Sequence, residues 1–320
     1  MRTIEIVATG GVEVLQWKDR PVPQPGDGEV LVQNRFIGVN FVDTYYRRGV
    51  YSAPLPLVLG MEGGGTVAAV GKGVADVKSG DQVTFAMQLG AYAEFTAVPA
   101  GKVVPVPPGL DLKLATAATL QGLTATFLTH HTYAVRPGDQ VLIHAGSGGV
   151  GQLLVQLAKI AGARVLTTVS NVEKAEIARA KGAHEVLDYD DFPARVRALT
   201  DGLGVHVVYD SVGKTTFMGS LDCLCKRGML VLFGQSSGPA PPLDPQILRP
   251  KGSVYLTRPS LSHYMDPREL LLGMADTLFG HIRAGRLQVH VDQVYPFAEA
   301  AEAHRYIAGR KTKGKILLTL

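Results

Sequence analysis

The sequence contains very little cysteine. Cys223 and Cys225 are the two cysteines in 320 residues. Two thiols at positions i and i+2 cannot comfortably close a disulfide with each other, so the chain has no disulfide framework. This absence excludes the class of small secreted domains that depend on disulfides for stability. It predicts a protein of a reducing, intracellular compartment.

Long hydrophobic runs and blocks of charge are also missing. The apolar stretches fall far short of the roughly 18 residues of a membrane span. The N-terminal MRTIEIVATGG has neither the apolar core nor the cleavage site of a signal peptide. We therefore expect a cytoplasmic protein with no membrane partner. The net charge is +4 and the basic residues are scattered, whereas nucleic-acid binding usually requires a clustered basic patch. The charge argues against a nucleic-acid partner and favours an anionic small ligand.

The composition that is present is that of a well-cored globular protein, with 46% hydrophobic and 19% charged residues, and the length suits about two domains. Up to about residue 110 the sequence holds short runs rich in β-branched residues, separated by Gly and Pro turn signals. These runs are 29–39, 65–71, 81–87 and 91–98. Such spacing predicts an antiparallel, barrel-like first domain.

From residue 112 the sequence pattern changes from short strand-like runs to helical segments. Residues 112–135 are poor in glycine and proline and predict one or two helices. Apolar strands then alternate with helices, as expected for a parallel sheet covered on both faces. The expected strands are 140–145, 163–170, 184–189, 205–212 and 228–234, and the expected helices are 150–161, 172–181, 192–200 and 215–226. The final part predicts a helix over 267–285, a strand over 291–297, a short helix over 298–309 and a strand over 314–320.

The stretch HAGSGGVGQLL, residues 144–154, fits the pattern G-x-G-x-x-G with Gly146, Gly148 and Gly151. An apolar strand enters this loop and a helix with leucines on one face leaves it. In that arrangement the backbone N–H groups and the positive helix end receive the pyrophosphate of a dinucleotide. The alternative is a loop that is merely tight and binds nothing.

The end of the second strand of this alternation indicates which dinucleotide is bound. An NAD-binding domain would place an Asp or Glu there for the ribose hydroxyls, but the sequence reads Ser170-Asn171. The missing carboxylate removes repulsion of a 2′-phosphate, and Lys174 can pair with that phosphate. We therefore predict NADPH rather than NADH. Two alternatives remain: Glu173 could reverse the preference, and Lys174 could be an ordinary solvated helix lysine.

Stretches that match those of a known protein family are spread along the chain. They are GVNFVDTYYRRGVY (38–51), PLVLGMEGGGTVAAVGKGV (56–74), GAYAEF (90–95), LQGLTA (120–125), HAGSGGVG (144–151), VVYDSVG (207–213), VLFGQSSG (231–238) and VYLTRPSL (254–261). In these stretches the chain resembles the zinc-free quinone oxidoreductases, the zeta-crystallin-like group of the medium-chain dehydrogenase/reductase superfamily.

The resemblance implies an α/β protein made of two domains. A GroES-like β-barrel catalytic domain would comprise residues 1–121 and 262–320, and a Rossmann-type doubly wound parallel sheet that binds NADPH would comprise residues 122–261. It also implies a homodimer, paired through an edge strand supplied by residues 228–234 together with 253–258.

The resemblance raises the question of a metal, because zinc-dependent relatives use zinc to reduce carbonyls. A catalytic zinc requires three ligands from Cys, His, Asp or Glu. Met61 stands where those relatives carry a histidine, and a thioether is a poor zinc ligand. His130 and His131 are adjacent on a helix and cannot face one point. We therefore expect no metal site.

The resemblance also assigns residues to the site. It places Asn40, Tyr45 and Tyr51 at the catalytic position: Asn40 and Tyr45 can donate hydrogen bonds to a quinone oxygen, and Tyr51 offers a flat apolar face. The alternative for each tyrosine is an aromatic core residue. It implies cofactor contacts at Phe41, Asp43, Thr124, Phe127, Gly148, Gly149, Val150, Gly151, Ser170, Lys174, Tyr189, Ser211, Phe233, Gly234, Gln235, Ser236, Thr257, Arg258 and Arg310.

The function that follows is an NADPH-dependent quinone oxidoreductase that transfers hydride or electrons to a quinone or another activated acceptor without a metal. A quinone is already electrophilic, so its reduction needs mainly proximity and orientation. One alternative is an NADPH-dependent reductase of enones or enoyl thioesters, with a tyrosine as proton donor. Another, from a different class, is an NADPH- or RNA-binding protein without significant turnover.

Overall fold

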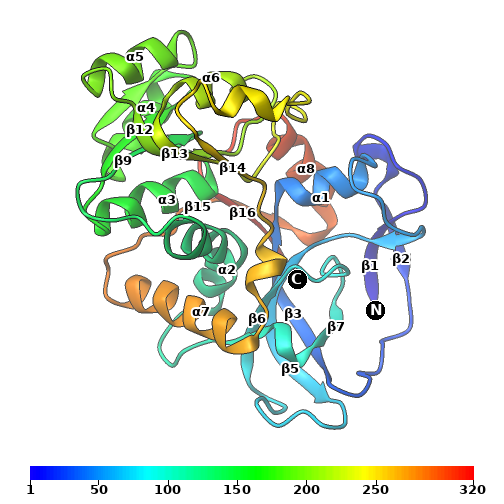
Figure 1. The fold of residues 1–320 in the computed structure, drawn as a ribbon. Coiled ribbons are helices and arrows are strands. Elements are labelled where there is room, and N and C mark those ends of the chain that lie inside the picture. Colours follow the sequence, from blue (N-terminus) through cyan, green and yellow to red (C-terminus); the bar gives the residue numbers. More distant parts are fainter. The chain divides into compact units, whose positions relative to one another are not determined.

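The computed structural model describes all 320 residues, and they divide into two compact units. Figure 1 follows the chain from one unit into the other and back. The chain passes from the first unit to the second within helix α2 (Leu112–Phe127). None of the helices combines the length and the apolar character that crossing a lipid bilayer requires. Unit 1 consists of Met1–Leu123, Tyr264–Gly285 and Val289–Leu320, and unit 2 of Thr124–His263 and Arg286–Gln288.

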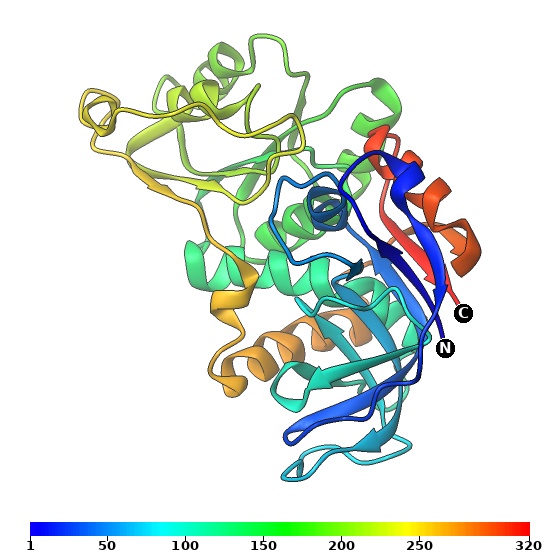
Figure 2. The same ribbon diagram turned by 90° about the vertical axis from the view of Figure 1, so that its right-hand side faces the viewer.

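Unit 1 contains a three-stranded and a seven-stranded sheet. The central strand of the larger sheet is β3, whose neighbours β5, β7 and β16 are all antiparallel to it. The late strand β16 therefore lies beside strands from the beginning of the chain, as both ribbon views show (Figures 1 and 2). The strands of unit 1 are β1 (Arg2–Ile6), β2 (Gln16–Asp19), β3 (Glu29–Val39), β4 (Leu57–Val58), β5 (Glu62–Val70), β6 (Gln82–Ala86), β7 (Phe95–Pro99), β8 (Val103–Pro105), β15 (Val291–Pro296) and β16 (Lys315–Thr319).

Apolar residues that alternate along these strands form the core of unit 1, together with the short helix α8. Val30, Val32, Ile37 and Phe85 are fully buried within it. The helices of this unit are α1 (Phe41–Arg47), α7 (Arg268–Arg283), α8 (Ala300–Ala308) and the first part of α2. The antiparallel first part that the sequence predicts is confirmed.

Unit 2 is a six-stranded sheet in the order β11-β10-β9-β12-β13-β14, and every neighbouring pair is parallel. Counted from β9, this is the strand order 3-2-1-4-5-6 of a dinucleotide-binding sheet. The chain adds β10 and β11 on one side of β9 and the later strands on the other, so the switch point lies between β9 and β12. The strands are β9 (Gln140–His144), β10 (Arg164–Thr168), β11 (Glu185–Leu187), β12 (Val205–Asp210), β13 (Leu224–Leu232) and β14 (Tyr255–Thr257). The helices are α3 (Gly149–Ile160), α4 (Val172–Ala180), α5 (Phe192–Leu199) and α6 (Phe217–Asp222). The predicted α/β fold with a doubly wound parallel sheet is confirmed.

One predicted helix is wrong in its second half. The sequence predicts a helix over 215–226, but α6 ends at Asp222 and Leu224 already begins β13. Leu224 pairs with Val205 of β12, and its side chain is buried in the core of unit 2. The buried strand pairing overrides the weak local helix preference of this segment.

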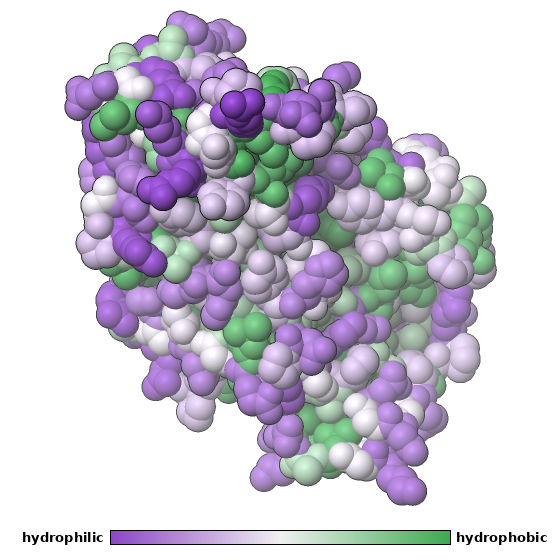
Figure 3. All heavy atoms as spheres, viewed as in Figure 1, coloured by the Kyte–Doolittle hydropathy of each residue, from purple (hydrophilic) through white to green (hydrophobic).

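The surface of both units is mostly hydrophilic in the view of Figure 3, with hydrophobic side chains in separate groups. The apolar residues of the strands are instead buried in the two cores.

Candidate functional site

The carboxyl ends of the parallel strands of unit 2 collect most of the residues that the sequence assigns to the cofactor. Because the strands are parallel, all their carboxyl ends lie at one edge of the sheet, where open α/β sheets bind ligands. The glycine loop follows β9, Ser170 and Lys174 follow β10, Tyr189 follows β11, Ser211 follows β12, Phe233 to Ser236 follow β13, and Arg258 follows Thr257, the last residue of β14. Thr124 and Phe127 lie on the part of α2 that belongs to unit 2.

The glycine loop has the geometry that a phosphate site requires. Gly148 is the N-cap of α3 and no side chain makes a capping hydrogen bond there, so no cap competes with a ligand for the positive end of the helix. A Cβ on Gly151 would lie 2.1 Å from the carbonyl oxygen of Ala145, so this position must be glycine for the helix to approach the loop. A Cβ on Gly148 would lie 3.3 Å from the carbonyl oxygen of Ala145, and no other protein atom would be within 4 Å of it. Apart from this one close contact, no protein atom fills the space into which a side chain at position 148 would project.

The segment after β10 is built by a helix cap. The Asn171 side chain accepts a hydrogen bond from the backbone N–H of Lys174 at 2.9 Å and begins α4. Ser170 is exposed and Lys174 is half-buried in the first turn of that helix. Glu173, whose direction the sequence left open, is exposed. The tip of β10 therefore carries Ser170 and the capping Asn171 and has no carboxylate before α4 begins.

Backbone hydrogen bonds join the loop after β12 to the loop after β13. The N–H of Phe233 donates to the carbonyl of Asp210 at 2.8 Å, and that of Ser236 donates to the carbonyl of Ser211 at 3.1 Å. A Cβ on Gly234 would lie 2.6 Å from the Ser211 carbonyl oxygen, so the two loops touch at backbone distance. Arg258 joins this group through a hydrogen bond from its guanidinium to the carbonyl of Leu232 at 3.2 Å.

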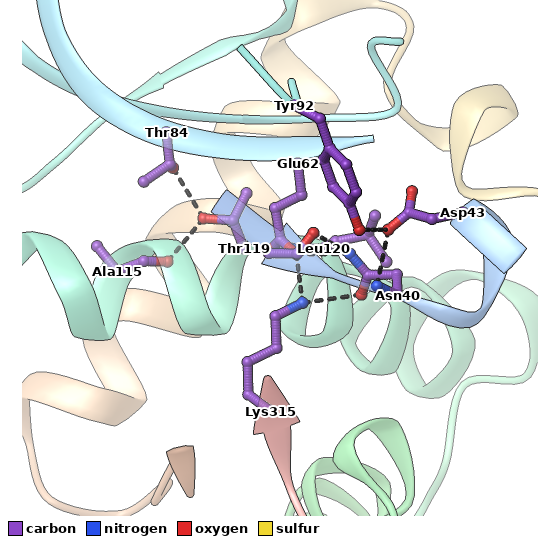
Figure 4. A network of polar contacts seen from close by, with 10 residues as sticks. Asn40, Asp43, Glu62, Thr84, Tyr92, Ala115, Thr119, Leu120 and Lys315 are labelled. Carbon is purple, nitrogen blue, oxygen red and sulfur yellow. Dashed lines mark hydrogen bonds and ion pairs between the residues drawn. The ribbon is translucent and has the colours of Figure 1, made fainter. Parts of the chain in front are cut away.

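Unit 1 contains a buried network of polar side chains, drawn in Figure 4. Lys315 of β16 and Glu62 of β5 form an ion pair, and both side chains are completely buried. The Lys315 ammonium also donates to Asn40 Oδ1 at 2.8 Å, and Glu62 Oε1 accepts the backbone N–H of Leu120 in α2 at 2.7 Å. Lys315 and Glu62 therefore bring β16, β5 and α2 together around Asn40, the residue that precedes α1.

The amide of Asn40 is fully committed within this network. Its Nδ2 donates to Glu62 Oε2 at 2.9 Å and to the carbonyl of Gly38 at 3.2 Å, while its Oδ1 accepts from Lys315. An amide has two N–H donors, so neither remains for a quinone oxygen. This geometry differs from the direct role that the sequence assigns to Asn40, and it makes Asn40 a residue that positions the start of α1.

A second arm of the network runs from Asp43 to Arg47 through Tyr92 and His304, all of them buried. A guanidinium can only donate, so Arg47 donates to His304 Nδ1 at 3.0 Å and the ring proton sits on Nε2. His304 Nε2 then donates to the Tyr92 oxygen at 2.9 Å, and Tyr92 donates to Asp43 Oδ2 at 3.2 Å. The same Oδ2 accepts the backbone N–H of Asn40 at 2.8 Å. The whole arm thus converges on one oxygen of Asp43.

Burial dominates the acid–base properties of this arm. It raises the pKa of Asp43 to about 7, against the opposing effects of the Asn40 N–H and Lys315. It lowers the pKa of His304 to about 3, in the same direction as the nearby Arg47 charge. Asp43 Oδ1 is buried and has no hydrogen-bond partner, so it is the oxygen on which a proton would reside. The carboxyl group of Asp43 is enclosed in unit 1 and faces this network.

The predicted tyrosines lie together in unit 1. Tyr51 packs edge-to-face against Tyr45 and against Tyr46, with ring centroids 5.3 and 5.6 Å apart. Tyr45 is buried, whereas Tyr51 and Phe41 are half-buried. Arg310 also belongs to unit 1, is exposed, and follows α8. The structure thus groups Asn40, Asp43, Tyr45 and Tyr51 around α1.

Several residues of these networks were missed by the sequence reasoning. Glu62, Tyr92, His304 and Lys315 received no role, although a charged residue next to a buried apolar strand is itself a signal. In unit 2, His144 and Asp210 were likewise given none, although each ends a largely apolar, buried strand. Burial of such side chains is costly unless they are paired, which is the reason to expect a partner.

Comparison with known proteins decides the family. Residues 26–108 match the model of the alcohol dehydrogenase GroES-like domain, and residues 149–265 match that of the zinc-binding dehydrogenase. The chain is 47% identical to a quinone oxidoreductase of Pseudomonas aeruginosa over 99% of both chains. The chain belongs to the quinone oxidoreductase family of the medium-chain dehydrogenases/reductases. The resemblance seen in the sequence is confirmed.

Two further proteins are similar to the chain along nearly its whole length. The structure of Escherichia coli quinone oxidoreductase complexed with NADPH is 42% identical, covers 100% of both chains, and superposes with a TM-score of 0.97. The chain is also 44% identical to a 2-haloacrylate reductase from a Burkholderia species, over 97% of this chain and 96% of that protein. The chain is thus similar to reductases whose names give different acceptors.

The match of residues 149–265 to the zinc-binding dehydrogenase family raises the question of zinc in this chain. No three side chains of His, Cys, Asp or Glu are gathered so that they could hold a metal ion. Met61, at the position where zinc-dependent relatives carry a histidine, is buried. The residues present therefore do not fit a zinc site. They do fit a dinucleotide, since α3 begins without a side-chain cap and a Cβ on Gly148 would have only one protein atom within 4 Å.

Proposed function

We propose that this member of the quinone oxidoreductase family is an NADPH:quinone reductase. The observation that carries the proposal is the uncapped start of α3, with Gly146, Gly148 and Gly151, at the switch point of the parallel sheet. The NADPH named in the E. coli structure supports the same cofactor for this chain. Residues 1–121 and 262–320 would act as the catalytic domain and residues 122–261 as the NADPH-binding domain.

In this proposal the residues of unit 2 bind and orient the cofactor. The backbone of Gly148, Gly149, Val150 and Gly151 receives the pyrophosphate. Ser170 and Lys174 pair with the 2′-phosphate, with Tyr189 nearby. The remaining proposed contacts are Thr124, Phe127, Ser211, Phe233, Gly234, Gln235, Ser236, Thr257 and Arg258, together with Phe41 and Arg310. Asp43, which the sequence also assigns to the cofactor, is fully buried, and its carboxyl is used within the network around Asn40. NADPH, once bound, supplies the hydride for the reduction.

The residues of unit 1 would serve the acceptor. Tyr45 and Tyr51 present aromatic rings and hydroxyl groups to a planar quinone, and Asn40 holds the start of α1 in place. Quinone reduction by this route requires orientation of two reactants more than acid–base catalysis, which matches a site without a metal-ligand cluster.

We further propose a cytoplasmic protein that forms a homodimer through the edge strand β14, where Tyr255 and Leu256 are exposed.

A second candidate is reduction of an activated carbon–carbon double bond. The 44% identity to a 2-haloacrylate reductase favours it, since a haloacrylate is such a substrate. This reaction needs a group that stabilises the developing oxyanion and a proton donor, and Tyr45 or Tyr51 could provide either.

The test is oxidation of NADPH by the purified protein with a panel of quinones, enones, 2-haloacrylate and an enoyl thioester, with NADH run in parallel. Faster turnover with quinones than with the other acceptors, and with NADPH than with NADH, supports the proposal. Turnover of the alkenes alone transfers the chain to the second candidate. Binding of NADPH without turnover of any acceptor overturns both and leaves a binding protein.

A variant tests the acceptor side of the proposal. Tyr51→Phe should raise the KM for the acceptor. The control is Tyr295→Phe, a change at a half-buried tyrosine on β15, which should leave this KM unchanged.

A further inference from the structure

The carboxyl edge of the sheet in unit 2 holds a buried hydrogen-bonded chain that the proposed function leaves unused. His144, the last residue of β9, is fully buried between its neighbours. Its Nδ1 lies 2.7 Å from Thr168 Oγ1 at the end of β10, and its Nε2 lies 2.9 Å from Ser220 Oγ on α6. Ser220 Oγ in turn lies 2.9 Å from Asp210 Oδ2 at the end of β12. Four residues thus connect three adjacent strands.

The direction of each hydrogen bond in this chain follows from Asp210. A carboxylate only accepts, so Ser220 must donate its hydroxyl proton to Asp210. The Ser220 oxygen then accepts from His144, which places the ring proton on Nε2. His144 Nδ1 is left as an acceptor and receives the hydroxyl proton of Thr168. Burial lowers the pKa of His144, in keeping with the neutral ring that this arrangement requires.

Each strand end held by this chain leads directly into a segment proposed to touch the cofactor. His144 is followed by Ala145, which has a left-handed φ of 55°, and then by the glycine loop. Thr168 stands two residues before Ser170, and its carbonyl accepts the N–H of Gly146 at 3.2 Å. The three segments are therefore joined below the edge on which the cofactor would lie.

Asp210 extends this connection to β13, the next strand of the sheet. Its Oδ1 accepts the backbone N–H groups of Val212 and Gly213 at 2.8 and 3.0 Å, which shapes the loop that begins with Ser211. That loop is the one hydrogen-bonded to the residues after β13. The ring of Tyr189 stacks on His144, with centroids 6.1 Å apart and planes 20° from parallel.

We propose that His144 is a positioning residue for NADPH: through Thr168, Ser220 and Asp210 it fixes the spacing of the glycine loop, the 2′-phosphate segment and the loop after β12. The inference rests on the proposed function. A network that merely stabilises the sheet would affect unfolding without changing cofactor affinity. The two roles are separated by measuring both quantities on the same variants.

The experiment uses variants of the hydroxyl groups, because replacing the buried ring of His144 could prevent folding. Thr168→Val keeps the shape of the side chain and removes the donor to His144, whereas Thr168→Ser keeps the hydroxyl. Ser220→Ala removes the other partner of the ring. The matched control is Thr200→Val, a buried threonine of unit 2 whose hydroxyl makes three local hydrogen bonds away from this chain. For each variant the Kd of NADPH, the kinetic constants and the thermal midpoint of the protein without cofactor are measured.

We expect Thr168→Val and Ser220→Ala to weaken NADPH binding about fivefold each, on the order of one lost buried hydrogen bond. The KM for NADPH should rise with little change in kcat, and Thr168→Ser should restore the affinity. Thr200→Val should lower the thermal midpoint to a similar extent and leave the Kd unchanged. Equal Kd values for Thr168→Val, Ser220→Ala and wild type would overturn the inference. Failure of the wild type to bind NADPH would instead overturn the proposed function.

Discussion

The Lys315 ammonium lies 2.8 Å from the side-chain oxygen of Asn40, a residue 275 positions earlier in the chain. Both side chains are buried, and Glu62 completes the contact by pairing with Lys315 and accepting from Asn40. The orientation of the Asn40 amide is thereby determined on both sides: its oxygen faces a cation and its nitrogen faces an anion. The residue in front of α1 is held by a buried charge pair.

Loss of the cation from this pair should be strongly destabilising. Lys315→Met leaves the Glu62 carboxylate buried without a counter-charge, which should cost about 3–5 kcal/mol of unfolding free energy. The double variant Glu62→Gln/Lys315→Met should cost less than the sum of the two single variants, because it buries no charge. The control is Arg2→Met, which removes a partner of Glu94 from a more exposed ion pair and should cost less than about 1 kcal/mol. Denaturant unfolding measures all four. Similar losses for Lys315→Met and Arg2→Met would contradict the prediction.

The buried Asp43 should make stability depend on pH. Its folded pKa of about 7 lies above its ordinary value of 3.8, so the folded protein keeps a proton that the unfolded chain has released. This contribution is fully present below about pH 4 and is lost as the pH rises through about 7. His304 acts oppositely: its folded pKa of about 3 lies below 6.5, so its contribution is present above that value and is lost as the pH falls.

Asp43→Asn separates the two contributions, because the variant retains His304. Between about pH 5 and about pH 8, wild type should lose ~2 kcal/mol of unfolding free energy relative to Asp43→Asn. Asp27→Asn, a change at an exposed loop position, should follow wild type throughout. If the difference between wild type and Asp43→Asn stays constant over this range, Asp43 does not hold the proton.

The two glycines at the start of α3 should respond differently to alanine. Gly151→Ala places a Cβ 2.1 Å from a backbone oxygen and should destabilise unit 2. Gly148→Ala meets protein only at 3.3 Å, so the fold should survive, but the methyl group would occupy space proposed for the pyrophosphate. We expect its NADPH affinity to fall about tenfold or more, by loss of close backbone approach. Gly280→Ala on α7, with nothing within 4 Å, should leave binding unchanged and stabilise the helix by about 1 kcal/mol. Calorimetry of unfolding and of NADPH binding distinguishes these outcomes, and unchanged affinity in Gly148→Ala would count against the proposed site.

Lys174 should set the preference between the two cofactors. Lys174→Glu replaces a cation in the first turn of α4 with an anion and should lower the ratio of NADPH to NADH affinity about tenfold or more, the size of a lost charged hydrogen bond. Arg179→Glu makes the same charge change at an exposed position later on that helix and should leave the ratio near wild type. The Kd values of both cofactors are the measurement. An unaltered ratio in Lys174→Glu would remove Lys174 from the 2′-phosphate site.

Local patterns predicted the elements that depend on local chemistry. The glycine loop at 146–151 is short, specific in its spacing, and flanked by a strand and a helix, so its place at the start of α3 could be read directly. The alternation of apolar strands and helices likewise predicted the parallel sheet. Where a segment suited two structures, as at 223–226, the buried pairing with β12 decided the outcome.

The buried networks could not be predicted in the same way. Nothing near Glu62 in the sequence indicates that its partner is Lys315, 253 positions away. The commitment of both Asn40 donors, and hence its indirect role, depends on that partner. Similarly, His144 stood inside a recognised motif, but its neighbours Thr168 and Ser220 come from other strands and helices. Pairing of distant polar residues requires the register of the strands, which a single sequence does not state.

The division of the chain into units also has a consequence for biosynthesis. Glu62 belongs to the first segment of unit 1, while Lys315 follows the whole of unit 2 in the sequence. A ribosome making this chain must therefore translate all of unit 2 before the ammonium that neutralises Glu62 exists. The main segment of unit 2 is continuous and can fold while it emerges, whereas unit 1 must wait for its last strand with the Glu62 carboxylate uncompensated. Nascent chains stalled before β16 should consequently be the species that chaperones and proteases recognise.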